Sequence, residues 1–194
     1  EKMRLDSSGN LGIGTSSPTY RLHSYNASSA NALILENGAN GGVYARWKRP
    51  NREYYLALDI NNNGGTDFSL YDATAAATRW TVDSSGNLGL GVTPSAWYSG
   101  QNWKAIDLTN AALRGGNSGA AIYSNAYVNS SVQNIYKSSS YALAYQLQAD
   151  TGAHAWLTAP SGTAGTAISF TQAMTLDASG NLGIGTSSPY SGGI

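Results

Sequence analysis

The sequence has no cysteine among its 194 residues and only two histidines. No disulfide framework is therefore possible, and no thiolate metal site is expected. No stretch approaches the ~18 consecutive apolar residues of a membrane-spanning helix, so we expect no membrane insertion. No signal peptide is recognisable and the chain opens on Glu1, so we expect a processed piece or fragment of a longer protein.

Charge is also scarce. Charged residues make up 11% of the chain, whereas globular proteins average about 25%. The 11 basic and 11 acidic residues balance. Because no basic stripe is present to neutralise phosphates, the composition excludes a nucleic-acid partner. The densest basic cluster lies within residues 46–52, and we interpret it as decoration of a loop at Pro50-Asn51.

The chain contains one motif three times, at residues 3–18, 80–94 and 174–189. Its shared core is Asp-x-Ser-Gly-Asn-Leu-Gly-Ile/Leu-Gly, followed by a proline. In the first copy, Met3 and Leu5 alternate with a polar residue, and Leu11 and Ile13 alternate with glycine. The turn formers between them, residues 6–10, predict a β-hairpin.

The alternating glycines, Gly12 and Gly14 in the first copy, are the unusual feature. Glycine within a strand usually marks the close approach of another backbone. One face of Leu11–Gly14 carries apolar side chains, and the other face is nearly bare. Since a lone hairpin is only marginally stable, we expect three chains to associate around an axis through these bare faces.

The long spacers between the motifs predict small β-modules. We expect an all-β, elongated, fibrous homotrimer of β-hairpin repeats alternating with such modules. Residues 141–148 have a helix-favouring composition but no clear cap, so a strand is preferred there. The predicted division is hairpin 1 at residues 1–18, module 1 at 19–79, hairpin 2 at 80–94, module 2 at 95–173, hairpin 3 at 174–189 and a tail at 190–194.

Few residues are candidates for chemistry. Residues 59–64 match the first half of a calcium-binding loop, but Leu70 stands where the loop needs a glutamate, so we interpret a hairpin loop. His23 and His154 lack any metal-ligand spacing. The Gly-x-Gly segments lack the further signals of a nucleotide site. We therefore predict no catalytic, cofactor-binding or metal residues, no cofactor and no enzyme activity.

Two further possibilities stay open at this point. Two carboxylates can meet from anywhere in a chain, so a glycoside hydrolase is an alternative, although turn capping accounts for the three motif aspartates. Two aromatic clusters are candidate platforms for sugar rings, and filling of a thin β core is the favoured interpretation of both. They are Trp97-Tyr98 with Trp103, and Tyr44 with Trp47. The ligand-binding residues are left unassigned.

The third motif copy, Met174–Pro189, resembles the repeat of tail-fibre and related appendage proteins of tailed bacteriophages and prophages. Stretches similar to the module that precedes this repeat occur at residues 97–107, 124–127 and 154–173. The resemblance implies an elongated homotrimer that reaches from the virion toward the host surface. Many such fibres end in a self-cleaving chaperone domain, but no autoproteolytic serine is assigned here.

The sequence and the resemblance together predict a structural segment of a phage tail fibre or related virion appendage. It would act as a shaft or adhesin in recognition of the host surface, with multivalent contacts to a glycan. The expected partners are further copies of the chain, other tail or capsid proteins of the virion, and a host cell-surface glycan or protein. The alternatives are a tailspike-like polysaccharide hydrolase and a bacterial surface adhesin.

Overall fold

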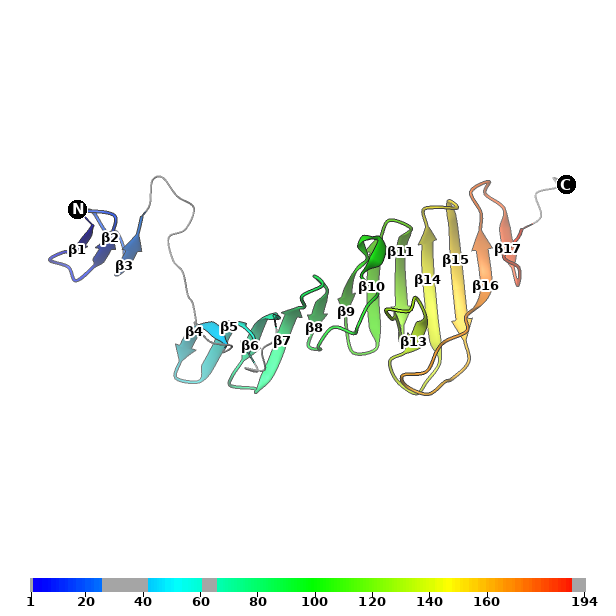
Figure 1. Cartoon of the computed structure of the whole chain (residues 1–194), viewed down its shortest axis with the longest axis horizontal. Coiled ribbons are helices and arrows are strands. Elements are labelled where there is room, and N and C mark those ends of the chain that lie inside the picture. The colour runs from blue at the N-terminus through cyan, green and yellow to red at the C-terminus, as the bar shows by residue number, and fades with distance from the viewer. Residues whose placement is uncertain (1, 26–41, 61–65, 190–194) are drawn as a thin grey trace. The chain divides into compact units, whose positions relative to one another are not determined.

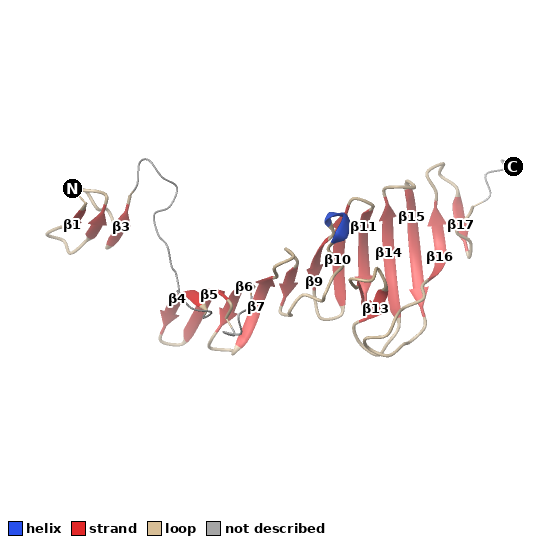
Figure 2. Cartoon of the chain, viewed as in Figure 1, coloured by secondary structure: helices blue, strands red, loops and turns tan. Residues whose placement is uncertain are grey.

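A computed structural model describes residues 2–25, 42–60 and 66–189 (Figure 1). The chain forms two compact units, Glu1–Ala39 and Asn40–Ile194, and each is described by itself. Apart from a 3-10 turn at Gly100–Asn102, the described segments contain strands and loops and no helix (Figure 2). None of them forms a helix with the length and apolarity to span a bilayer. The all-β prediction is confirmed.

The first unit is a three-stranded sheet. Its strands are β1 (Met3–Leu5), β2 (Leu11–Ile13) and β3 (Leu22–Ser24). The first two form the antiparallel hairpin that the motif predicts, with Leu5 opposite Leu11. The third strand pairs with β2 in parallel, so the chain crosses back before it rejoins the sheet.

The second unit is built on a twelve-stranded sheet in which every neighbouring pair is antiparallel except β8 and β9. A separate hairpin, β12 (Ala126–Val128) and β13 (Asn134–Tyr136), contacts β10 and β14. Within residues 141–148 the strand Ala142–Gln148 forms, as preferred, and burial alternates at its start, where Ala142 and Ala144 are buried and Leu143 is exposed. The strands are β4 (Val43–Arg49), β5 (Arg52–Leu58), β6 (Phe68–Asp72), β7 (Ala77–Val82), β8 (Leu88–Leu90), β9 (Lys104–Asp107), β10 (Ala111–Gly116), β11 (Gly119–Ser124), β14 (Ala142–Gln148), β15 (Ala153–Ala159), β16 (Thr171–Leu176) and β17 (Leu182–Ile184).

The three motif turns have the same hydrogen bonds. Asp6 Oδ1 accepts the backbone N–H groups of Ser8 and Asn10 at 2.9 and 2.8 Å, and Asn10 Nδ2 donates to Asp6 Oδ2 at 3.1 Å. The intervening Gly9 has a φ of 79°, which explains why glycine stands there. Equivalent bonds join Asp83 to Ser85 and Asn87, and Asp177 to Ser179 and Asn181.

The first glycine of each Gly-x-Gly pair is covered by the chain's own next segment. A Cβ added to Gly12 would lie 2.6 Å from Thr15 O, and one added to Gly183 would lie 2.9 Å from Thr186 O. Gly89 and the oxygen of Val92 approach more closely still. The close approach was predicted correctly, but the approaching backbone belongs to the same chain. The expected contact between the glycine faces of three chains stays a prediction, because an added Cβ at Gly91 or Gly185 would still meet open space.

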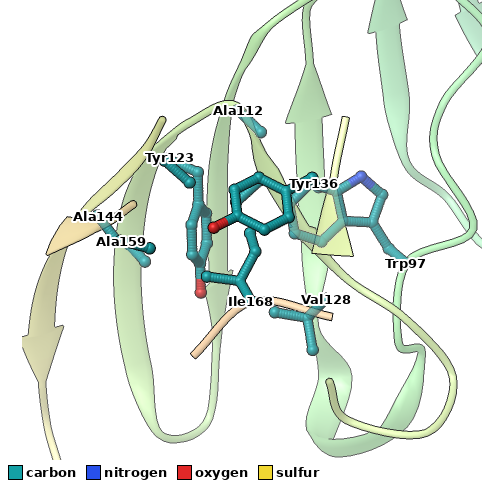
Figure 3. Packing of buried hydrophobic residues seen from close by; sticks show 12 residues of the cluster. Trp97, Ala112, Tyr123, Val128, Tyr136, Ala144, Ala159 and Ile168 are labelled. Carbon is teal, nitrogen blue, oxygen red and sulfur yellow. The ribbon is translucent and has the colours of Figure 1, made fainter. Parts of the chain in front are cut away.

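The core lies under the second module. On one face of the sheet, Tyr123 stands among small residues such as Ala112 and Ala144, and these leave room for large side chains from covering segments (Figure 3). Val128 comes from the β12–β13 hairpin, and Trp97 packs with its ring centroid 6.0 Å from that of Tyr123. Trp97 thus fills the core, as its favoured interpretation predicts.

Candidate functional site

The two histidines have local partners. His23, in the first unit, accepts the backbone N–H of Thr19 at 3.3 Å. His154, in the second unit, lies 2.6 Å from the hydroxyl of Tyr145 and stacks on Trp156. Among the described residues, no group of three or more His, Asp or Glu side chains is placed to hold a metal ion.

The calcium-like stretch is described only in part, because residues 61–65 lie outside the described ranges. Asp59 begins the stretch and Asp67 follows it, and the backbone N–H of Asp59 donates to Asp67 O at 3.0 Å. Burial, and then the negative charges of Asp83 and Asp59, raise the pKa of Asp67 above its ordinary value. The Asp83 side chain itself binds the second motif turn.

The aromatic pair Tyr44 and Trp47 does not form one platform. The two residues lie on opposite faces of β4, because they are three positions apart and successive side chains of a strand alternate between its faces. Tyr44 stacks on Tyr55 with 5.0 Å between ring centroids. Trp47 lies at an open hollow of about 520 Å³ with Tyr54 and Arg79.

One face of the twelve-stranded sheet carries an unbroken apolar row. Each member is paired directly with the next across the strands, so all of the side chains lie on the same face. The pairing continues through the second module to the last strand. The row is Val43, Leu58, Phe68, Val82, Leu88, Ile106, Leu113, Ile122, Tyr145, Trp156, Met174 and Ile184.

Half of the members of this apolar row are exposed, and the other half are partly buried. Leu113, Ile122 and Ile184 are 46%, 54% and 78% exposed. The β12–β13 hairpin packs on the opposite face, because it joins the core cluster of Tyr123 and Ala112. In the part of the chain that the structure describes, the row therefore has no covering layer. Contiguous exposed apolar surface is typical of interaction faces, so the row is a candidate for one.

The opposite face carries a cavity of about 330 Å³. Arg114 on β10 and Gln146 on β14 line the cavity, and each is paired directly with Ala121 on β11, the strand between them. The small side chain of Ala121 leaves space between the two long ones. Asn134, at the start of β13, lines the cavity from the covering hairpin. The volume falls in the range of small-molecule sites, about 300–1,000 Å³.

Trp103 and Tyr123 supply the aromatic walls. The guanidinium carbon of Arg114 lies 3.8 Å from the Trp103 ring centroid and 5.9 Å from that of Tyr123, which makes a cation–π contact with Trp103. An added Cβ at Gly116 would overlap Trp103, so glycine is needed for this placement. Burial raises the pKa of Tyr123 above its ordinary value, so its phenol stays neutral.

Three buried polar atoms in this cavity lack a partner. Within the described residues, the buried side-chain nitrogen and oxygen atoms without a hydrogen bond are Trp103 Nε1, Arg114 Nε and Asn134 Oδ1, and all three residues line the cavity. Arg114 is only 7% exposed and forms no ion pair with a described carboxylate. Buried polar groups are rarely left unpaired, so their convergence marks a candidate site.

Of the cavity residues, the sequence predicts Trp103 as a sugar-platform candidate and gives no prediction for the others. A signal for Arg114 was present, because the pattern Ala112-Leu113-Arg114 places the arginine on the same strand face as a buried alanine. Asn134 gave no such signal, since only the fold of the β12–β13 hairpin carries it over the sheet.

No protein-family model matches the chain, and no curated protein matches it. Among solved structures, the ORF18 protein of Geobacillus virus E2 is similar at 18% identity and a TM-score of 0.34. The match covers 46% of this chain and 19% of the viral protein, so it spans about a fifth of that protein's length. A likeness this weak assigns no function.

Proposed function

We propose that this chain is a structural, non-enzymatic segment of a virion appendage, such as a phage tail fibre, and that it works as a homotrimer. The observation that carries the proposal is the unbroken apolar row across twelve strands on an uncovered face. The motif's resemblance to tail-fibre repeats gives the assembly its setting, on the virion and facing the host.

Copies of the same chain are the occupants that fit this face best. Twelve strands at about 4.8 Å spacing, with two side chains of each strand on this face over about 14 Å, give a face of roughly 800 Å², which is about the area that each partner contributes to a standard stable interface. Each copy presents the same apolar row. The number three comes from the resemblance, and a two-fold sandwich of sheets is the competing arrangement.

The mass of the assembly in solution tests the proposal. Multi-angle light scattering should give close to three times the chain mass of 20.2 kDa. A monomer would overturn the proposal, and a dimer would overturn its trimeric part. The measurement uses the whole chain at several concentrations, so that weak association is separated from a stable complex.

Two substitutions locate the interface. Leu113 and Ile122 are direct cross-strand neighbours at the middle of the row. The double substitution Leu113→Glu with Ile122→Glu would therefore place two carboxylates at the centre of an interface formed by the row. The double variant should be monomeric. Ser161→Glu, in an exposed loop that follows β15, is the matched control and should keep the wild-type mass. An unchanged mass in the double variant would place the interface elsewhere.

As a shaft or adhesin, such an assembly would present three copies of every surface site. Weak contacts with a host glycan then add up, because each further contact is intramolecular once the first has formed. A tailspike-like hydrolase is the alternative, and incubation with host polysaccharides separates the two. Release of new reducing ends by the pure chain would contradict the non-enzymatic role.

A further inference from the structure

We infer that the cavity formed by Trp103, Arg114, Tyr123, Asn134 and Gln146, the Arg114 cavity, binds a saccharide that carries a carboxylate. The inference rests on the proposed function, since it assigns the site and the chemical class of the glycan that the assembly would meet. It is carried by the three unpartnered buried atoms and by the charge of Arg114.

The charge of Arg114 points to an anion. A buried cation is costly unless it is paired, and this guanidinium has a tryptophan ring as its close described partner. Its Nε atom is buried and makes no hydrogen bond. A guanidinium offers parallel N–H donors that match the two oxygens of a carboxylate. A carboxylate in the cavity would therefore satisfy both the charge and the open donor.

The other cavity groups match a sugar ring. Trp103 Nε1 is an open donor and Asn134 Oδ1 is an open acceptor, and a sugar hydroxyl can both accept and donate. The rings of Trp103 and Tyr123 present apolar surface to the C–H faces of a pyranose. The cavity thus combines stacking, one donor, one acceptor and one cation.

A phosphate ligand fits less well. Asp150 also lines the cavity and is the acidic residue there, while Arg114 is the basic one. A single cation opposed by a carboxylate favours a monoanion over a phosphate dianion, which proteins bind with several basic groups or backbone N–H donors. We therefore assign a uronic or sialic acid rather than a phosphorylated sugar.

The test is calorimetric titration of the intact assembly with three probes: oligosaccharides of glucuronic acid, of galacturonic acid and of N-acetylneuraminic acid. Each is compared with its carboxyl methyl ester, which removes the charge and keeps the ring. At least one acid should bind, and its ester should bind about tenfold more weakly or worse, because a hydrogen bond to a charged group is lost.

Arg114→Gln should weaken the acid by a similar factor, and Arg114→Lys should fall between it and wild type. The matched control is Arg52→Gln, which removes a half-exposed arginine on β5 and should bind as wild type does. Thermal unfolding of each variant shows that it is folded. If Arg114→Gln does not fold, the Arg114→Lys variant and the ester comparison decide the question.

The inference is overturned if none of the three acids binds, if an ester binds as well as its acid, or if Arg114→Gln binds as the control does. If the chain is a trimer and binds none of the three acids, this inference is contradicted and the proposed assembly is not. If the chain is a monomer and binds one of the acids, the proposed assembly is contradicted and the saccharide site is not.

Discussion

Asn87 accepts the backbone N–H of Ala105 through Oδ1 at 3.0 Å and thereby joins the turn of the second motif to the strand that follows it in the sheet. The same side chain donates through Nδ2 to Asp83 Oδ2 at 2.9 Å. It is only 2% exposed. One amide therefore closes the turn and fixes the parallel entry of β9.

The first prediction concerns this asparagine. Asn87→Ala should lower the free energy of unfolding by about 1–3 kcal/mol, because it leaves the buried N–H of Ala105 without its acceptor. Asn181→Ala removes the equivalent turn bonds in the third motif, where the side chain is half-buried, and should have a smaller effect. Urea denaturation of both variants measures the difference, and equal losses would contradict the second role of Asn87.

A second prediction concerns the glycine face of the hairpin. Gly89→Ala should destabilise the chain strongly, because the added Cβ would overlap the carbonyl oxygen of Val92, which is backbone and cannot rotate away. Gly115→Ala is the control, since an added Cβ there has open space and no positive φ. Thermal unfolding should separate the two clearly. A tolerated alanine at position 89 would refute the close approach.

The third prediction concerns a buried ion pair. Lys137 binds the carboxylate of Asp107, which is fully buried and also accepts Trp97 Nε1 at 3.1 Å. Lys137→Met should cost about 3–5 kcal/mol of stability, because a buried carboxylate loses its cation. Lys104→Met, at an exposed position, should cost little. Chemical denaturation gives both values. An unchanged free energy of unfolding in Lys137→Met would show that the ion pair does not stabilise the fold.

A fourth prediction concerns acid stability. Hydrogen bonds and charge from Arg79 hold the pKa of Asp72 at about 2, below its ordinary value of 3.8. A carboxyl with a lowered pKa in the folded state stabilises the fold above its unfolded pKa, and this contribution is lost as the pH falls toward the folded pKa. The free energy of unfolding should therefore drop between about pH 4 and about pH 2.

Asp72→Asn provides the comparison for this pH dependence. The variant should be less stable at neutral pH and should show a shallower slope in the acid range. A residual slope is expected, since the turn hydrogen bonds also lower the pKa of Asp6 and of Asp177. Identical slopes in the variant and wild type would contradict a stabilising role for the Asp72 charge.

The sequence predicts the motif turns well because their bonds are local. Asp6 and Asn10 are four residues apart, so the residue types alone specify the contact. The apolar row is harder to predict. Leu88 meets Ile106 through a parallel pairing that skips the intervening loop, and such a register is set by the whole sheet rather than by either strand.

At the first glycine of each pair, the local rule predicts a close approach but does not identify its partner. Glycine in a strand does signal close approach, but the rule does not say whose backbone approaches. At Gly12 it is the carbonyl of Thr15, three residues on. Similarly, the Arg114 cavity depends on Asn134, which reaches the site only when a separate hairpin folds over the sheet.

The parallel junctions have an evolutionary consequence. In β2–β3 and in β8–β9 alike, the motif hairpin ends one stretch of sheet and offers the same backbone edge to the next. A coding segment bounded by two motifs could thus be exchanged as a cassette, because the newcomer would meet identical neighbours at both ends. Recombination at the motif would replace the strands that form the Arg114 cavity, while the motif turns kept their hydrogen bonds.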